Sequence, residues 1–311
     1  MSTDNQREDV VGPLAPGLYL VATPIGNLED ITLRALRVLR SADRIACEDT
    51  RQTQKLLNHY GIRTPTVSYH RHNEADRTAE LMEALKSGAR IAVVSDAGTP
   101  GIADPGGQIA LAAIAAGVPV FPIPGANAAI SALIASGLAG TGPAGDGATL
   151  ESFTFHGFLP AKEGQRRTAL EALRGRADGT LIFYEAPHRI LDTLADVEVI
   201  FGATQHVVVA RELTKIHEEF LRGAVSEVLK TLAERATVRG EFVLLFAPGL
   251  STSQPDVGGS ASQPQLSIAA EIRELMKTQG LDEKDALKQV ARARNIGKSE
   301  AYRELQRERG K

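Results

Sequence analysis

A run of residues suited to ligand binding, Ser95–Gly106, follows the apolar segment Ile91–Val94. It contains the carboxylates Asp96 and Asp104 together with several glycines and prolines. Glycine lets the backbone approach a ligand closely, and proline removes conformations that a binding loop would otherwise lose on ordering. A helical pattern follows at once, and the loop between a buried strand and a helix is where parallel α/β sheets bind small molecules. The sequence therefore favours a ligand loop over a stiff connector.

Alternating strand-like and helix-like segments surround this loop in the amino-terminal half. In chain order they are the strand Leu18–Ala22, the helix Ile31–Leu39 with Asp30 as its cap, the strand Arg44–Cys47, the helix Thr50–Asn58, the strand Thr66–Tyr69, the helix Glu74–Lys86, the strand at Ile91, a helix to Ala116, the strand Val118–Ile123 and the helix Asn127–Ala135. This order predicts a mainly parallel sheet with helices on both faces.

The carboxyl-terminal half has more hairpin-like neighbours, which predicts a mixed sheet. Its expected strands are Phe153–Leu159, Thr180–Tyr184, Val207–Arg211, Phe220–Arg222 and Phe242–Phe246, and its expected helices lie near Gly164–Leu173, Ile190–Val197 and Ser226–Glu234. We expect five parts: a disordered lead-in over 1–16, α/β domains over 17–125 and 126–249, a flexible Ser/Gly/Pro-rich linker over 250–265 and a helical tail over 266–311.

Composition excludes several classes of protein. The net charge of −3 argues against a nonspecific nucleic-acid binder. Cys47 is the only cysteine, which excludes a disulfide framework and a CxxC metal site and fits a reducing cytoplasm. The start lacks an apolar signal-peptide core. The uncharged stretch between Asp104 and Asp146 is interrupted by prolines, so it predicts buried core rather than a membrane span.

Motifs for phosphate or metal binding are not convincing in this sequence. Gly140–Gly145 matches GxGxxG, but no strand precedes it, so a linker is the better interpretation. His70 and His72 have no carboxylate or cysteine at ligand spacing, and we expect them to be solvated. We predict no metal site.

Several segments together resemble the RsmI branch of the tetrapyrrole methylase superfamily, the ribosomal RNA small-subunit methyltransferases that act on a cytidine 2′-hydroxyl. Besides Ser95–Gly106 they are Val21–Thr32, Ala46–Arg51, Pro122–Ala129, Phe183–Arg189 and Ala210–Lys215. The resemblance spans about Gly17–Phe246. Tetrapyrrole-acting relatives usually have a GxGPG-type first loop, whereas this chain reads Thr23-Pro24-Ile25-Gly26-Asn27, which favours the RNA branch.

The resemblance implies a two-domain tetrapyrrole-methylase-like α/β fold with a small helical carboxyl-terminal module. It also implies S-adenosylmethionine as the methyl donor in the cleft between the domains, a homodimer, and 16S ribosomal RNA or the small ribosomal subunit as the partner. The donor-binding residues that it implies are Pro24, Ile25, Gly26, Asp96, Gly98, Thr99, Ile102, Ala128, Ala129 and Tyr184.

A ribose 2′-hydroxyl is a weak acid, so a positioned base or a cation near the developing alkoxide would help its methylation. Candidates for these roles are Glu48, Asp49, Arg51, Glu185, His188, Arg189, Arg211, Glu212 and Lys215. An ion-pair network between the domains is an equally good interpretation of the same residues. Cations expected to face RNA phosphates are Arg71, Lys162, Arg166, Arg167, Arg189 and Lys215.

The tail over 266–311 contains eleven lysines and arginines against eight acidic residues. Its amphipathic pattern fits either an RNA-docking module or a segment that packs on the main body and stabilises a dimer. Two other functions stay open from sequence: a non-catalytic protein that binds an adenosyl ligand or RNA, and a tetrapyrrole methyltransferase of the same fold.

Overall fold

The computed structural model describes residues 12–70, 72–138, 152–175 and 179–249, and, of the tail, residues 272, 276, 282–293 and 303. The chain divides into two units, Met1–Ser253 and Gln254–Lys311. Both predicted α/β domains belong to the first unit. Most of the predicted lead-in, the linker over 250–265, the GxGxxG match at Gly140–Gly145 and Arg71 lie outside the described residues.

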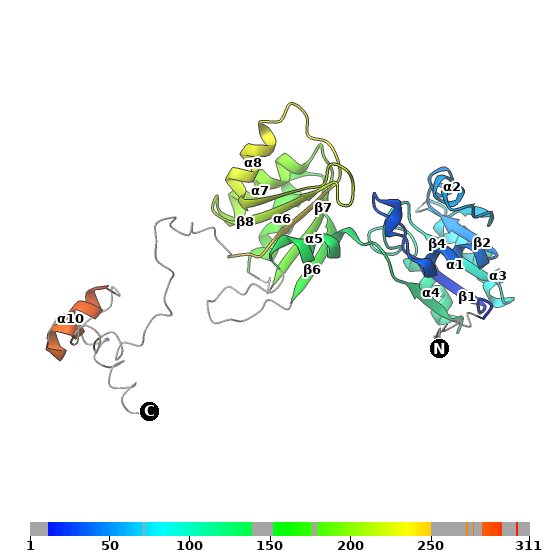
Figure 1. The fold of residues 1–311 in the computed structure, drawn as a ribbon, viewed down its shortest axis with the longest axis horizontal. Helices are drawn as coiled ribbons and strands as arrows, with labels where there is room; N and C mark the ends of the chain where they lie inside the picture. Colours follow the sequence, from blue (N-terminus) through cyan, green and yellow to red (C-terminus); the bar gives the residue numbers. More distant parts are fainter. Residues whose placement is uncertain are drawn as a thin grey trace, which may run out of the picture. The chain divides into compact units, whose positions relative to one another are not determined.

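The first domain is built on a five-stranded parallel sheet, as predicted (Figure 1). Its strands are β1 (Gly17–Val21), β2 (Arg44–Cys47), β3 (Thr66–Ser68), β4 (Arg90–Val94) and β5 (Val120–Ile123), in the spatial order β3-β2-β4-β1-β5. The central strands β1 and β4 are nearly fully buried. Continuous apolar strands are typical of a parallel sheet covered on both faces.

Two pairs of helices cover the two faces of this sheet. The helical segments of the domain are η1 (Leu28–Asp30), α1 (Leu33–Ser41), α2 (Thr50–His59), α3 (Glu74–Lys86) and α4 (Gly107–Ala115). Helices α1 and α2 share one apolar core, and α3 and α4 share the other. One predicted cap was wrong: Asp30 lies in η1, and the Thr32 hydroxyl accepts the Ala35 N–H to cap α1. This bond provides an acceptor for a backbone N–H in the first turn of α1, which has no acceptor within the helix.

The connections that follow the neighbouring strands β1 and β4 leave the first sheet on opposite faces. The chain leaves β1 through α1, which packs on one face, and it leaves β4 through α4, which packs on the other face. The loops after these two strands therefore separate at the carboxyl edge of the sheet and leave a crevice. The ligand loop predicted from sequence, Ser95–Gly106, follows β4 and borders this crevice.

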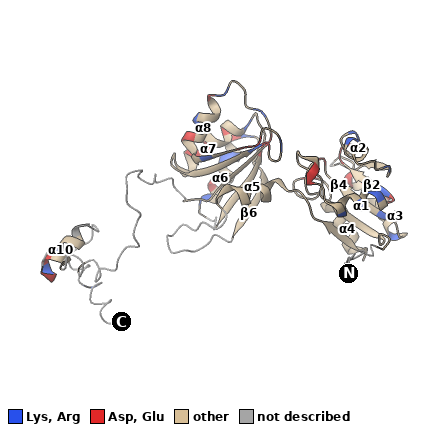
Figure 2. Cartoon of the chain, viewed as in Figure 1, with Lys and Arg blue, Asp and Glu red and all other residues tan. Residues whose placement is uncertain are grey.

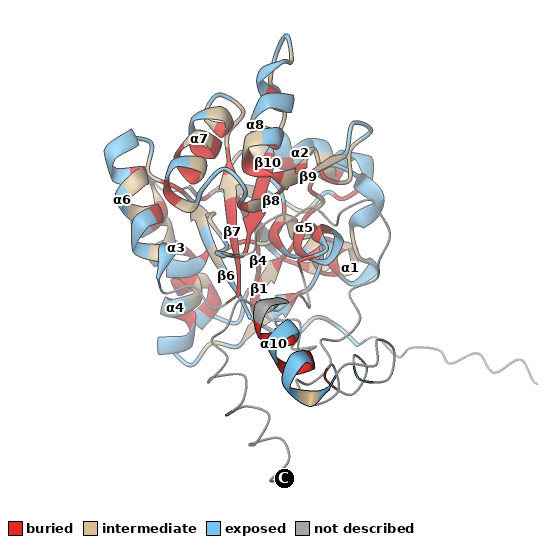
Figure 3. Ribbon diagram, turned by 90° about the vertical axis from the view of Figure 1, so that its left-hand side faces the viewer, coloured by how far each residue is buried: buried red, intermediate tan, exposed pale blue. Residues whose placement is uncertain are grey.

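The second domain has the mixed sheet that the sequence predicted. Its elements are α5 (Ala128–Ser136), β6 (Phe153–Phe158), α6 (Glu163–Arg174), β7 (Thr180–Glu185), α7 (Ile190–Phe201), β8 (His206–Arg211), β9 (Glu219–Ala224), α8 (Val225–Ala233) and β10 (Phe242–Phe246). The strand order is β6-β7-β10-β8-β9; β6 and β7 are parallel and the other pairs are antiparallel. Helices α6, α7 and α8 share one core with this sheet, and α5 packs in the other. Figure 3 shows the buried residues between these layers.

Within the second unit the described helix is α10 (Glu283–Ala293), so part of the predicted helical tail is confirmed. Ala286, Leu287, Val290 and Ala291 are buried and form one face of this helix. Among the described residues, no helix is long and apolar enough to cross a membrane.

A buried ion pair joins α6 to α7. The Asp196 carboxylate accepts hydrogen bonds from Nε of Arg166 and Nε of Arg167, each at 2.6 Å. The Arg166 and Asp196 side chains are 5% and 2% exposed, whereas Arg167 is partly exposed and also pairs with Glu163. Because water does not reach this carboxylate, its negative charge is stabilised by the two arginines.

Asp196→Ala should destabilise the protein by about 3–5 kcal/mol, because it leaves the Arg166 guanidinium buried without its counter-charge. The matched control is Glu163→Ala, which removes the exposed partner of Arg167 and should cost at most about 1 kcal/mol. Denaturant unfolding measures both. Equal costs for the two variants would show that the buried pair contributes no more than the exposed one.

Candidate active site

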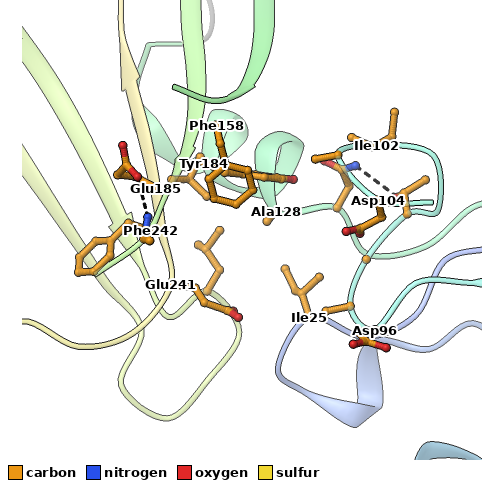
Figure 4. A pocket seen from close by; sticks show the side chains of 18 of the residues that line it. Ile25, Asp96, Ile102, Asp104, Ala128, Phe158, Tyr184, Glu185, Glu241 and Phe242 are labelled. Carbon is orange, nitrogen blue, oxygen red and sulfur yellow. Dashed lines mark hydrogen bonds between the residues drawn. The ribbon is translucent and has the colours of Figure 1, made fainter. Parts of the chain in front are cut away.

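A pocket of 430 Å³ lies against the crevice of the first sheet, and the second domain forms its other wall (Figure 4). The first domain and the start of α5 contribute Ile25, Glu48, Asp96, Ala97, Gly98, Thr99, Ile102, Ala103, Asp104, Asn127 and Ala128. The second wall consists of Phe158, Tyr184, Glu185, Ala186, Pro187, Leu213, Glu241, Phe242 and Val243. The pocket is large enough for a small molecule of nucleoside size.

Reciprocal hydrogen bonds between Thr23 and Gly98 join the two loops that border the crevice. The Thr23 N–H donates to the Gly98 carbonyl at 2.9 Å, and the Gly98 N–H donates to the Thr23 carbonyl at 3.0 Å. The buried Thr23 hydroxyl donates to the Ser95 carbonyl, and the Ser95 hydroxyl donates to the Gly98 carbonyl. Gly98 has a φ of 85°, a conformation that favours glycine. These bonds hold the start of the ligand loop in one conformation.

Thr99 connects the same loop to the first turn of α5. Its hydroxyl donates to the Ala126 carbonyl at 3.2 Å and accepts a bond from the Asn127 side-chain amide at 3.3 Å. The Asn127 side-chain oxygen also caps α5 by accepting the Ile130 N–H. One asparagine therefore orients both the helix terminus and the loop that faces the pocket.

Aromatic side chains dominate the wall that the second domain provides. The Tyr184 hydroxyl accepts the Ala129 N–H at 3.3 Å, and its ring contacts Phe155 and Phe158 edge-on. Burial raises the pKa of Tyr184, and the nearby Asp104 adds to the rise. The phenol is therefore neutral at physiological pH and bonds to the start of α5.

The carboxylates at the pocket differ in how strongly they are bound by neighbours. Glu185 is buried, and it accepts bonds from the Ala186 N–H at 2.9 Å and the Thr193 hydroxyl at 2.7 Å, besides pairing with Arg189. The Asp96 carboxylate accepts the Asp49 N–H at 3.0 Å. Glu48 lines the pocket without an ion pair or side-chain hydrogen bond to any described residue.

The structure brings many of the sequence-predicted site residues to this pocket. Its walls include Ile25, Glu48, Asp96, Gly98, Thr99, Ile102, Ala128, Tyr184 and Glu185. Pro24, Gly26, Asp49 and Ala129 are adjacent in the chain to lining residues but do not line the pocket themselves. Arg51, Arg211 and Lys215 do not line it either. Arg51 is almost fully exposed and pairs with Asp49, whose pKa it lowers by hydrogen bonding.

Lys215 belongs to a cluster in the turn between β8 and β9. Its Nζ donates to Glu212 at 2.8 Å and to Glu241 at 2.9 Å. A Cβ on Gly26 would lie 2.4 Å from the Lys215 Cγ, so a glycine is needed where the first loop meets this turn. Glu212 and Thr214 have φ values of 49° and 65°, which shows that this turn has an unusual backbone conformation.

Five residues that line the pocket have no role predicted from the sequence: Phe158, Leu213, Glu241, Phe242 and Val243. Sheet register explains why they join the site: Phe242 pairs with both Glu185 and Arg211 across antiparallel ladders. The start of β10 therefore lies at the same edge as the ends of β7 and β8. If β10 had been predicted to run antiparallel to β7 and β8, its first residues would have been expected at this edge of the sheet.

The two histidines considered in the sequence differ in their surroundings. His72 is exposed, as expected, but Nδ1 of His70 is buried without a hydrogen-bond partner among the described residues. No cluster of three metal-binding side chains occurs in the described part of the chain.

Comparisons with known proteins agree with this fold. A family model described as Tetrapyrrole (Corrin/Porphyrin) Methylases matches residues 17–229. A curated relative, "Ribosomal RNA small subunit methyltransferase I" of Halalkalibacterium halodurans, is 48% identical over 285 residues, which cover 92% of this chain and 93% of the relative.

Two solved structures from Thermus thermophilus share the fold. Uroporphyrin-III-C-methyltransferase is 24% identical, with a TM-score of 0.53 over 75% of this chain and 95% of that chain. A uroporphyrin-III C-methyl transferase complexed with S-adenyl homocysteine is 18% identical, with a TM-score of 0.50 over 74% of this chain and 97% of that one. The predicted fold class is confirmed.

The Lys215 cluster should make stability depend on pH. Burial opposes both charges, but the hydrogen bonds between them outweigh it, so the pKa of Glu212 is lowered and the pKa of Lys215 is raised. The charged Glu212 stabilises the fold, and this stability is lost as pH falls through its lowered pKa and the carboxylate is protonated. The charged Lys215 also stabilises the fold, and this stability is lost as pH rises through its raised pKa and the ammonium group loses its proton. Lys215→Met should cost about 1–2 kcal/mol near neutral pH.

Thermal unfolding from pH 3 to pH 11 tests this expectation against Lys230→Met, which removes an exposed lysine 4.0 Å from Glu234. The control should change stability by less than about 0.5 kcal/mol at every pH. The cost of Lys215→Met should shrink at both ends of the range. A pH-independent cost would contradict the assigned ion pairs.

Proposed function

The chain belongs to the tetrapyrrole (corrin/porphyrin) methylase family, among relatives named ribosomal RNA small subunit methyltransferase I, and from this premise we propose that it methylates small-subunit ribosomal RNA. The donor is S-adenosylmethionine, and the acceptor is the 2′-hydroxyl of a cytidine ribose in 16S ribosomal RNA. The observation that carries the proposal is the pocket itself, which combines an apolar wall with convergent carboxylates beside two fixed loops.

The residues of the pocket suit the parts of this donor. Ile25, Ala128, Leu213 and Val243 offer apolar surface for a flat base. Asp96 keeps acceptor capacity beyond its bond to the Asp49 N–H, so it can bind a ribose hydroxyl or an ammonium group. When bound, the donor supplies an electrophilic sulfonium methyl group. The protein's own contribution is to fix that group and the acceptor in one geometry.

The acceptor hydroxyl must lose its proton during transfer, and Glu48 is the carboxylate that we assign to this role. It is half-buried at the pocket and is not engaged by a described cation. Glu185 suits the role less well, because its oxygens already bind the Ala186 N–H, the Thr193 hydroxyl and the Arg189 guanidinium. Glu185 instead holds Arg189, which donates to the carbonyls of Leu159 and Pro160, the two residues after Phe158 in the chain.

The proposal also includes the homodimer and the cytoplasmic location that the family resemblance implies. Exposed apolar side chains on α4 and α5, which are Leu111, Ile114 and Ile134, are consistent with self-association.

Asp96→Ala and Glu48→Gln should separate binding from chemistry. Asp96→Ala should weaken S-adenosylmethionine binding, measured by calorimetry, by roughly tenfold or more, because a charge-assisted hydrogen bond to the donor is lost. Glu48→Gln should leave donor affinity within about twofold and lower kcat by roughly 10²-fold or more. Each variant is the control for the other. Unchanged donor affinity in Asp96→Ala, or unchanged kcat in Glu48→Gln, would remove the corresponding assignment.

Nucleoside analysis of small-subunit ribosomal RNA treated with the enzyme and donor tests the reaction. We expect a methylated cytidine that carries its methyl group on the ribose and not on the base. A methyl group on the base would contradict the 2′-hydroxyl assignment. Methylation of a tetrapyrrole without methylation of RNA would instead favour the substrate class of the solved structural neighbours.

A further inference from the structure

Helices α1 and α2 differ from the other described helices in their charges. Helix α1 contains Arg34, Arg37 and Arg40, and α2 contains Arg51 and Lys55, but neither contains a carboxylate. Every other described helix either has acidic residues or has no charge at all. Two cationic helices are unexpected in a chain whose net charge is −3. Figure 2 shows Lys and Arg positions along α2 without an acidic residue.

The cations of this surface have few acidic partners. Arg34, Lys55 and the nearby Arg63 are exposed, and none forms an ion pair within the described part of the chain. The acidic residues nearest to them in the chain are Asp30 of η1 (Leu28–Asp30), Asp49, which pairs with Arg51, and Glu74, which is buried and accepts the Tyr69 hydroxyl. The cations on α1 and α2 therefore keep most of their capacity to bind an external anion.

Most of the cations that the sequence suggested for RNA binding are paired with carboxylates of the second domain. Arg166 is buried against Asp196, and Arg167 pairs with Asp196 and Glu163. Arg189 pairs with Glu185, and Lys215 pairs with two glutamates. Lys162 alone of the described candidates is exposed and has no ion pair among the described residues. The second domain therefore uses these cations mainly within its own structure.

The two cationic helices form one surface that begins at the pocket. Both pack in the same apolar core on one face of the first sheet, and Arg40 donates to the Tyr60 carbonyl at the end of α2. Helix α2 starts directly after Glu48, which lines the pocket, and Asp49, which donates its N–H to Asp96. Its ten residues extend about 15 Å from that point. A polar hollow lined by Thr50, Arg51, Gln54, Lys55, Asn58 and Thr66 lies along it.

We propose that the α1–α2 surface, defined by Arg34, Arg37, Arg40, Lys55 and Arg63, binds the RNA backbone next to the acceptor nucleotide. This inference rests on the proposed function and names the part of the enzyme that holds its polymeric substrate. Phosphate contacts fix the register of a nucleic acid without reading its sequence, and here they would direct one ribose toward the pocket. A surface of unpaired guanidinium and ammonium groups fits a polyanion better than an apolar or acidic protein partner.

The test removes three exposed cations from this surface and compares an equal change elsewhere. The variant is Arg34→Gln/Lys55→Gln/Arg63→Gln, and the control is Lys86→Gln/Arg174→Gln/Lys230→Gln, which are exposed positions on α3, α6 and α8. Both variants lose three positive charges, so net charge does not distinguish them. None of the six residues lines the pocket. Donor affinity, circular dichroism and KM for small ribosomal subunits lacking the methyl group are measured from 50 to 200 mM salt.

We expect the α1–α2 variant to bind the donor normally, to keep kcat within about twofold and to raise KM for the subunits by roughly tenfold at the higher salt concentration. The slope of log affinity against log salt should fall by about two to three, close to one for each lost phosphate contact. The control should behave like wild type. Equal KM values and salt slopes for variant and control would overturn the inference. Failure of wild-type protein to methylate RNA at any salt concentration would instead reject the proposed function.

Discussion

The paired hydrogen bonds between Thr23 and Gly98 are the constraint on which the site depends. The two loops follow strands whose connecting helices pack on opposite faces of the sheet, so the sheet alone would let the loops separate. The bridge holds them together, and the buried hydroxyls of Thr23 and Ser95 add further bonds at the same place. Ile25 and Asp96 reach the pocket from opposite sides of this bridge. A methyl transfer depends on holding the donor and the acceptor in one orientation, and a rigid pocket wall formed by these two loops serves that purpose.

The two domains contribute different chemistry to the pocket. The first domain supplies backbone groups and carboxylates from loops, whereas the second supplies aromatic and aliphatic surface from strand ends. Contact between the domains is close enough that Gly26 has no room for a side chain beside Lys215. Most charges of the second domain near this junction are paired internally, whereas Glu48 and Asp96 of the first domain line the pocket without an ion pair to any described residue.

Local patterns in the sequence predicted the elements well, because apolar periodicity and turn residues act over short distances. The strands Arg44–Cys47 and Phe242–Phe246 and the helix Glu74–Lys86 were predicted with the bounds that the structure has. Contacts between distant segments could not be predicted in this way. The burial of Arg166 against Asp196 depends on how α6 packs on α7, and the role of Phe242 depends on sheet register. The net charge of the whole chain likewise gave no indication of the two cationic helices, because acidic residues elsewhere in the chain balance their charges.

The strand order of the first sheet has a consequence for synthesis of the chain. Strand β1 is made first, yet both of its neighbours come late, since Gly17 pairs with Arg90 and Leu18 pairs with Val120. The nascent chain therefore carries an apolar strand with both edges open until β4 has emerged from the ribosome, and with one edge open until β5 has emerged. Such a strand invites incorrect pairing with other chains. The Thr23–Gly98 bridge needs both β1 and β4, so a nascent chain that ends before β4 lacks the contact that fixes the binding loops.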